Sequence, residues 1–267
     1  MIKRNEYKKY NYIENYSTKN EPLPYRYPDM KSTYDKFSEI FDIPKNNFIL
    51  TNGCENAFRI ALLATGIKEI SIETPGWELA KVIADSLDIK IYPLQLAIID
   101  NKIKYCTDYK NNKNIYITDR INNFIYHPDY IVNNGINIID ETYTQTYLYD
   151  NNREINFNKI IIGSFSKIAD PSLRLGYILY NKNFNDRFQQ LREQYISGSA
   201  CKYINSLLDK PKCFNYNING LELKTEWYQT VENKLNTDLP YKEFKIPIIK
   251  NNKIINEKSF YRYGVIK

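Results

Sequence analysis

The sequence predicts an α/β fold built on a mainly parallel sheet covered by helices. From about residue 48, short β-branched runs alternate with segments of helical periodicity. Each β-branched run ends in polar residues, and the chain of 267 residues is 43% hydrophobic, which allows a sizeable core. Strands that alternate with helices favour a parallel sheet whose crossover connections are those helices.

The expected elements follow one another along the chain. Strands are expected at 48–50, 70–73, 89–94, 115–118, 136–139, 160–162 and 175–180. Helices are expected from 55 to about 64, from 78 to 87, and as one long helix from 184 to about 208. The lysine-rich tail is expected to hold one helix within 214–235 and then two or three short strands. The run at 136–139 is expected at the centre of the sheet.

Composition and charge argue against several classes of function. The net charge of +6 comes from lysines scattered singly among Asn, Ile and Tyr, a composition typical of an AT-rich genome, so no nucleic-acid partner is expected. No apolar stretch approaches the length of a membrane span, and residues 1–16 lack the apolar region of a secretory signal. The four cysteines form no CxxC pair and His127 is the single histidine, so no metal site is expected. The cysteines are expected to be reduced thiols of a cytoplasmic protein.

Ligands of such a sheet bind beyond the carboxyl ends of its strands. Those ends carry chemically suggestive residues at 52–54, 118–123, 140–143 and 163–167. Lys167 in GSFSK would be costly to bury unless it is paired or neutralised, for example as an imine with an aldehyde cofactor. Taken alone, the same lysine is better explained as a surface residue on a loop.

Neighbouring motifs support an anionic, planar ligand. Arg174 in SLRLGY can grip a phosphate, and Asp140 in DETY needs a cationic partner such as a protonated pyridine nitrogen. Gly53 precedes a helix N-terminus that suits a phosphate, and Trp77 can stack on a planar ring. Each has an ordinary alternative: a structural ion pair, a helix cap, a glycine turn or core packing.

Taken in this order and at these spacings, the motifs resemble the class I/II pyridoxal-phosphate (PLP) aminotransferases of fold type I. The histidinol-phosphate aminotransferase branch, with its phosphoserine- and phosphothreonine-decarboxylating relatives, is the most similar. The resemblance runs from about Asn20 to Leu208 and includes NEPLPYRYPD and REQYISGSACKYINSLL. It implies an N-terminal arm (1–25), a large PLP-binding domain (26–200) with helices on both faces of a mainly parallel mixed sheet, and a reduced α+β small domain (201–267).

The resemblance also implies roles for individual residues. Lys167 would carry PLP as a Schiff base and move the substrate proton, and Asp140 would keep the pyridine nitrogen protonated. Tyr143 and Asn122 would bind the phenolic oxygen of the ring, on which Trp77 would stack. The phosphate would be bound by residues from two turns: Gly53, Cys54, Glu55, Ser164, Ser166 and Arg174.

Two further roles concern the dimer and the substrate. Tyr27 would reach the neighbouring subunit's cofactor, which implies a homodimer, and Arg262 would bind the substrate carboxylate. The sequence departs from the family at Asn122-Asn123-Phe124-Ile125, where an Asn-Pro-Thr-Gly turn is usual, and in the short region after Leu208.

Three functions follow from these features. The first is an aminotransferase that moves an amino group between an amino acid and a 2-oxo acid. An acidic or phosphorylated amino acid is one candidate substrate. The second is a decarboxylase of a small or phosphorylated amino acid that uses the same residues. The third is a reduced, non-catalytic homologue that acts as a binding module, which the short C-terminal region favours and the intact Lys167, Asp140, Tyr143 and Arg174 disfavour.

Overall fold

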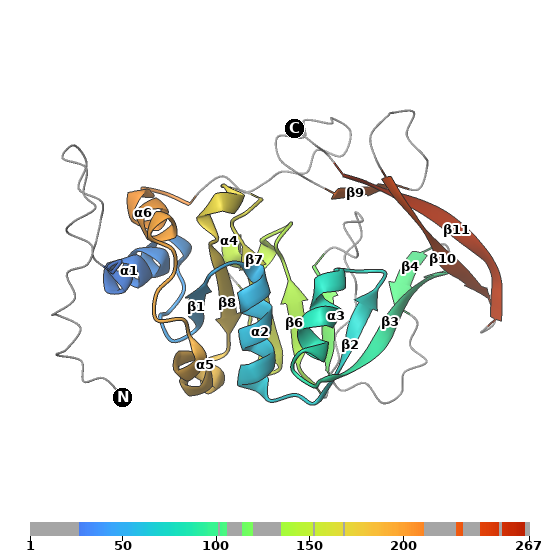
Figure 1. Cartoon of the computed structure of the whole chain (residues 1–267), viewed down its shortest axis with the longest axis horizontal. Coiled ribbons are helices and arrows are strands. Elements are labelled where there is room, and N and C mark those ends of the chain that lie inside the picture. The colour runs from blue at the N-terminus through green and yellow to red at the C-terminus, as the bar shows by residue number, and fades with distance from the viewer. Residues whose placement is uncertain are drawn as a thin grey trace.

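The computed structural model describes nine segments of the chain. These are residues 27–100, 102–105, 114–119, 135–151, 153–167, 169–210, 228–231, 241–250 and 253–264. They form an α/β protein in which helices flank one long twisted sheet (Figure 1). The fold class expected from the sequence is confirmed.

Eleven strands of the described segments make up the sheet. Ten follow the order β1-β8-β7-β6-β5-β2-β3-β10-β11-β9, and β4 pairs with β3 outside that path. The bounds are β1 (Phe48–Thr51), β2 (Glu69–Thr74), β3 (Lys90–Ile99), β4 (Lys102–Tyr105), β5 (Ile115–Thr118), β6 (Asn137–Asp140), β7 (Lys159–Ser164), β8 (Gly176–Tyr180), β9 (Tyr228–Val231), β10 (Tyr241–Lys250) and β11 (Lys253–Gly264).

The central strands β3, β2, β5, β6 and β7 are parallel to their neighbours within that group. On one side, β8 runs antiparallel between β7 and β1. On the other, β10 pairs with β3 in parallel through Ile248 and Ile249, and antiparallel partners β11 and β9 follow. The expected central place of the strand that ends at Asp140 is confirmed, because β6 lies between β5 and β7.

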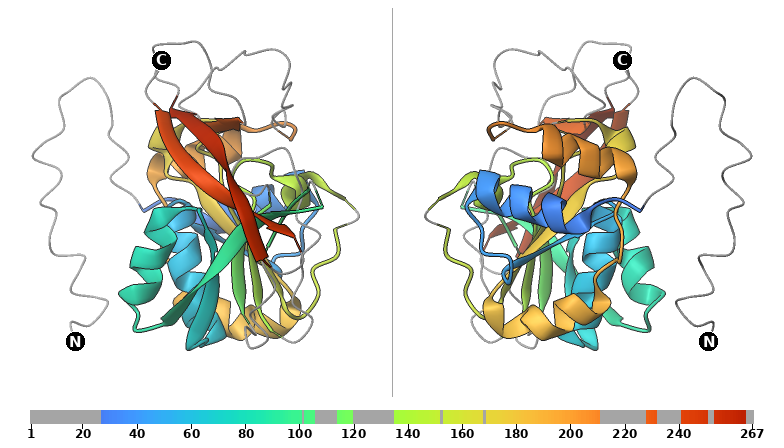
Figure 2. Two further views of the ribbon diagram at one scale, coloured as in Figure 1. Left: turned by 90° about the vertical axis from the view of Figure 1, so that its right-hand side faces the viewer. Right: turned by 90° about the vertical axis from the view of Figure 1, so that its left-hand side faces the viewer.

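Helices cover both faces of the sheet, as the two turned views show (Figure 2). Residues on α2 (Cys54–Thr65), α3 (Glu78–Asp85) and α5 (Asn185–Leu191) share one apolar cluster with alternate strand residues such as Ile138. Residues on α1 (Met30–Phe41), α4 (Thr146–Tyr149) and α6 (Gly198–Ser206) share a second cluster with the intervening residues, such as Ile139. The β-branched strands therefore bury both faces, as parallel strands do.

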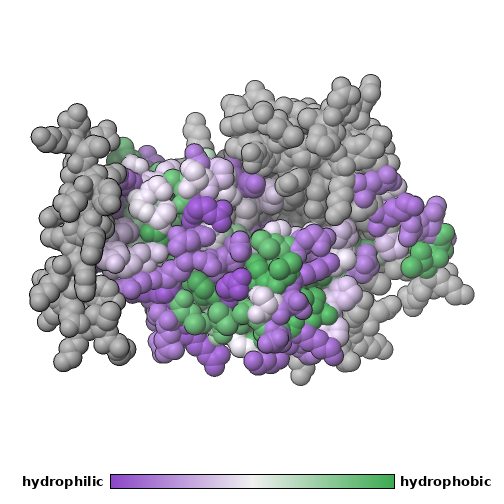
Figure 3. Space-filling view, viewed as in Figure 1, coloured by the Kyte–Doolittle hydropathy of each residue, from purple (hydrophilic) through white to green (hydrophobic). Residues whose placement is uncertain are grey.

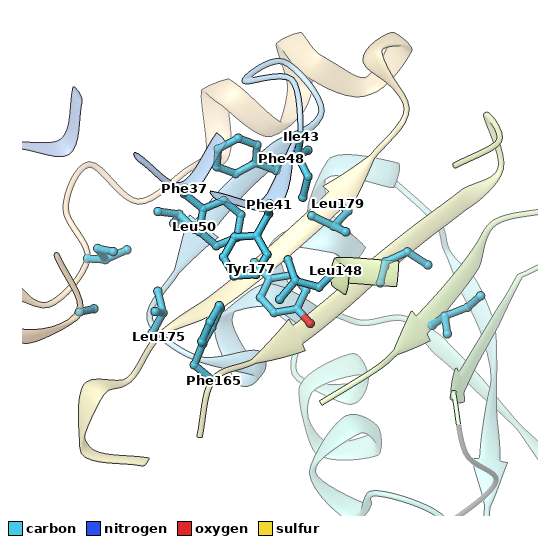
Figure 4. Packing of buried hydrophobic residues seen from close by; sticks show 14 of the residues in the cluster. Phe37, Phe41, Ile43, Phe48, Leu50, Leu148, Phe165, Leu175, Tyr177 and Leu179 are labelled. Atoms are coloured by element: carbon cyan, nitrogen blue, oxygen red, sulfur yellow. The ribbon is translucent and has the colours of Figure 1, made fainter. Parts of the chain in front are cut away.

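Aromatic side chains dominate the cluster beneath α1. Phe37 and Phe41 on that helix meet Phe165 and Tyr177 from the end of β7 and from β8 (Figure 4). The helix begins at Asp29, whose carboxylate accepts a hydrogen bond from Ser32 N at 3.0 Å. This packing holds the residues just after Lys159–Ser164 against a rigid layer, which positions the turn that contains Lys167.

The outer surface of α2 and α3 mixes polar and apolar groups (Figure 3). Leu63 is 48% exposed and Val82 is 60% exposed. Exposed apolar side chains of this kind are ordinary on a protein surface, so we assign no interface to this face. Within the described residues, no helix is both long and apolar enough to cross a membrane.

The expected strands are all present, but one helix prediction is wrong. The single helix expected over 184–208 is two helices, α5 and α6, because Arg192 is extended (φ −59°, ψ 144°) and Ser197 caps a new helix by accepting from Ala200 N at 3.1 Å. One helix was expected within 214–235. The structure describes only Tyr228–Val231 of that segment, and these residues form β9, so the rest of that prediction lies outside the described residues.

Two more findings were not anticipated in the sequence. Helix α1 had not been predicted, and β10 and β11 are long, with ten and twelve residues. Helix α6 spans the expected domain boundary between residues 200 and 201. The division into an arm and two domains stays a prediction.

Candidate active site

The N-terminus of α2 forms the first part of the site. Thr51 Oγ1 donates to Gly53 O at 3.0 Å, and Gly53 adopts φ 89°, a conformation that favours glycine. Gly53 is the N-cap and provides no side-chain acceptor, so the first amides of the helix stay available to an anion.

Arg174 lies directly against this turn. It is the C-cap of the short helix η4 (Pro171–Leu173), at φ 50°. A Cβ added at Gly53 would lie 2.9 Å from Arg174 Nη2, so only glycine lets the guanidinium approach the backbone this closely. A helix N-terminus and a guanidinium together make a corner that favours an anion such as phosphate.

Asp140 ends β6 beside that corner, and its carboxylate is buried. Its Oδ1 accepts from Thr142 N at 2.9 Å, and its Oδ2 accepts from Tyr116 OH at 2.9 Å and Cys54 Sγ at 3.5 Å. Burial raises the pKa of Asp140, and the hydrogen bonds from Thr142, Tyr116 and Cys54 oppose that rise. Burial, with the adjacent charge of Asp140, raises the pKa of the Cys54 thiol well above its usual range.

An aromatic group lies next to Asp140. Trp77 is the half-buried residue before α3, and its ring centroid is 6.2 Å from that of Phe58 and 6.3 Å from that of Tyr116. The centroids of Phe58 and Tyr116 are 4.6 Å apart. Trp77 is therefore linked to Asp140 through the single side chain of Tyr116.

Lys167 and Tyr143 meet at the ends of β7 and β6. Both side chains are half-buried, and Lys167 Nζ lies 5.5 Å from the centre of the Tyr143 ring, within the range of a cation–π contact. Ser164 Oγ donates to Leu175 O at 3.2 Å and accepts from Ser166 N at 3.1 Å, which shapes the turn that leads to Lys167. The amine thus follows a buried strand through a hydrogen-bonded turn.

Two buried carboxylates fix the turn that carries Tyr143. Glu141 accepts from Tyr147 N at 2.5 Å, Leu148 N at 3.1 Å and Tyr177 OH at 2.9 Å. Asp119, at the end of β5, accepts from the hydroxyls of Thr144 and Thr146. Burial raises the pKa of Glu141 well above its usual range, and the charge of Asp119 adds to the rise.

Replacing Glu141 by glutamine should destabilise the protein by about 2 kcal/mol, measured by denaturant unfolding. All three groups around Glu141 are donors, and a carboxamide would turn an NH2 toward one of them. Glu154→Gln is the matched control on an exposed side chain. An unchanged midpoint for Glu141→Gln would contradict the prediction and would mean that the carboxyl already carries a proton.

Four other residues are expected at the site, namely Glu55, Tyr27, Arg262 and Asn122. Glu55 is exposed in the first turn of α2, and Tyr27 is 76% exposed and stacks on Tyr195 with ring centroids 4.4 Å apart. The backbone of Arg262 pairs with Lys242 and Thr230 in the C-terminal hairpin. Asn122 lies outside the described residues. The roles expected of these four residues stay predictions.

The structure adds neighbours that the motifs did not indicate. Tyr116 and Thr142 contact Asp140, and Glu193 accepts from Asn52 N, Asn52 Nδ2 and Asn56 Nδ2 at 2.5, 2.9 and 2.6 Å. A tyrosine within a buried β-branched run was a usable signal, since its hydroxyl needs a partner. The Glu193 contacts bridge about 140 residues of sequence and left no local pattern.

The residue types of this site fit pyridoxal phosphate. The corner at Gly53 and Arg174 suits a phosphate, and the buried Asp140 pairs with no cation among the described residues. A ring bearing a protonated nitrogen would complement the carboxylate, and Lys167 supplies an amine. The described residues contain no group of three His, Cys, Asp or Glu side chains suited to a metal ion.

Comparison with known proteins adds to this picture at the level of fold. No protein-family model and no curated protein matches the sequence. Among solved structures, a histidinol-phosphate aminotransferase from Clostridium acetobutylicum is similar with a TM-score of 0.54 and 16% identity over 68% of this chain and 60% of that one.

Two other structures are similar over comparable lengths. An L-threonine-O-3-phosphate decarboxylase from Porphyromonas gingivalis has a TM-score of 0.50 and 19% identity over 68% of this chain and 60% of its own. An aspartate aminotransferase from Thermotoga maritima has a TM-score of 0.52 and 15% identity over 67% of this chain and 58% of its own. The chain thus spans about 60% of the length of these structures. It has the fold of the fold type I pyridoxal-phosphate aminotransferases, among them the histidinol-phosphate aminotransferases.

Proposed function

We propose that this chain is a PLP-dependent aminotransferase that moves an amino group between an amino acid and a 2-oxo acid. The observation that carries the proposal is Asp140, a buried carboxylate that accepts three hydrogen bonds and pairs with no cation among the described residues. A carboxylate in that setting is stabilised by a cationic ligand group. PLP, when bound, supplies a protonated ring that withdraws electrons from the substrate's α-carbon.

The residues of this chain would divide the work among them. Arg174 and the first amides of α2 would bind the phosphate, and Asp140 would hold a proton on the ring nitrogen. Lys167 Nζ would attach the cofactor and then carry the proton of the substrate's α-carbon. Tyr143, beside that amine, would tune its pKa. An acidic or phosphorylated substrate would suit the net charge of +6.

We further propose that the functional unit is a homodimer in which Tyr27 reaches the neighbouring site. Its 76% exposure in the single chain leaves it accessible to a second copy. Arg262 would bind the substrate carboxylate.

The proposal is tested by mixing the purified protein with PLP and recording its absorbance. A band that borohydride abolishes is expected, and amino acids that are substrates should shift it. A protein that stays colourless in excess PLP would contradict the proposal and favour a non-catalytic binding module.

A decarboxylase of a small or phosphorylated amino acid is the second candidate. The similarity to an L-threonine-O-3-phosphate decarboxylase supports it, and it would use the same residues. The two reactions differ in the bond of the α-carbon that breaks. Release of carbon dioxide would indicate decarboxylation, whereas formation of a 2-oxo acid would indicate transamination.

A further inference from the structure

Tyr116 is a buried tyrosine that connects two residues of the proposed cofactor site. Its side chain is 0% exposed, its hydroxyl donates to Asp140 Oδ2 at 2.9 Å, and its ring is tilted against Trp77 at 6.3 Å. Burial and the charge of Asp140 raise the pKa of Tyr116 well above its usual range. The hydroxyl therefore keeps its proton and acts as a donor.

The hydrogen bonds on Asp140 are unevenly shared between its two oxygens. Oδ2 accepts from Tyr116 OH and Cys54 Sγ, while among the described residues Oδ1 accepts from Thr142. Each carboxylate oxygen has two acceptor positions. Both positions on Oδ2 are thus taken, and the position left over lies on Oδ1.

We propose that Tyr116 is a positioning residue for the cofactor, which holds the Asp140 carboxylate ionised and turned so that Oδ1 faces the ring nitrogen. This inference rests on the proposed function. This role explains why a tyrosine stands at position 116, since a phenylalanine would fill the same space beneath Trp77. The hydrogen bond favours the charged form of Asp140, the form that pairs with a protonated ring.

Tyr116→Phe should weaken PLP binding about tenfold, measured as the dissociation constant in an absorbance titration. In an Asp140→Asn background the same change should cost less than about twofold, because the charge that Tyr116 supports is gone. Thermal unfolding of the four apo-proteins measures the hydrogen bond without PLP.

Tyr180→Phe is the matched control. Tyr180 is also 0% exposed in the apolar cluster under α2, but its hydroxyl donates to Phe48 O at 3.2 Å, away from Asp140. Its removal should leave the dissociation constant for PLP unchanged.

The other outcomes separate this inference from the function it rests on. If the wild type binds PLP and Tyr116→Phe binds it equally well, the positioning role is overturned and the proposed function stands. Equal losses in both backgrounds would also overturn it, because Tyr116 would then act through packing alone. If the wild type binds no PLP, the proposed function and the positioning role both fail. Non-additive effects of Tyr116→Phe and Asp140→Asn on thermal unfolding would then assign the hydrogen bond to stability only.

Discussion

Replacing Lys167 by alanine should abolish covalent retention of PLP. After borohydride reduction and digestion, mass spectrometry of the wild type should find one cofactor on the peptide that contains Lys167, and the variant should carry none. Substrates are identified as the amino acids that shift the absorbance band of the bound PLP. Their turnover should fall at least about a thousandfold in the variant, because one amine both attaches the cofactor and moves the proton. No other effect predicted for this chain is as large.

Lys159→Ala is the control for this experiment. Lys159 is the first residue of β7, the strand that Lys167 follows, and its Nζ contacts Tyr147 OH at 3.3 Å at the opposite end of that strand. Its replacement should leave the label on Lys167 in place. Retention of the label by Lys167→Ala, or its appearance on another lysine in the wild type, would refute the assignment.

The fold could be predicted because the residues of each central strand indicate by themselves that the strand is buried. The runs that became β5, β6 and β7 are β-branched on both faces, and their ends carry the polar residues that the site uses. The rule that ligands bind beyond the carboxyl ends of strands pointed to Asp140, Gly53 and Lys167 and placed them together before any distance was known. Arg174 was indicated by its place seven residues after Lys167.

Features that depend on contacts between distant segments were not predicted. The break between α5 and α6 follows from extended backbone at Arg192 and a cap at Ser197, which periodicity over 184–208 concealed. Helix α1 is absent from the expected elements, although Tyr34, Phe37 and Phe41 repeat at the spacing of an amphipathic helix. The partners of Tyr116 and Glu193 lie 24 and about 140 residues away, beyond any local pattern.

Arg153→Ala should destabilise the protein by about 3 kcal/mol. Arg153 Nε donates to Tyr147 O at 2.6 Å, Nη1 to Asp42 O at 2.9 Å, and Nη2 to Phe41 O at 2.9 Å and Leu148 O at 3.0 Å. One guanidinium thereby satisfies carbonyls at the end of α1 and along α4. Truncation would leave those carbonyls without this partner and remove a link between α1 and α4.

Arg187→Ala is the matched control, since its guanidinium makes one long hydrogen bond, 3.4 Å to Ala64 O near the end of α2, and its loss should cost below about 0.5 kcal/mol. Arg153→Lys should fall between the two, because an ammonium carries the charge but cannot span four carbonyls. The denaturant midpoints of the three variants, compared at equal slope of the unfolding transition, measure these losses of stability. Equal midpoints for the two alanine variants would show that the four-carbonyl contact contributes nothing. A lysine variant as stable as the wild type would show that charge at the helix ends matters more than the planar fork.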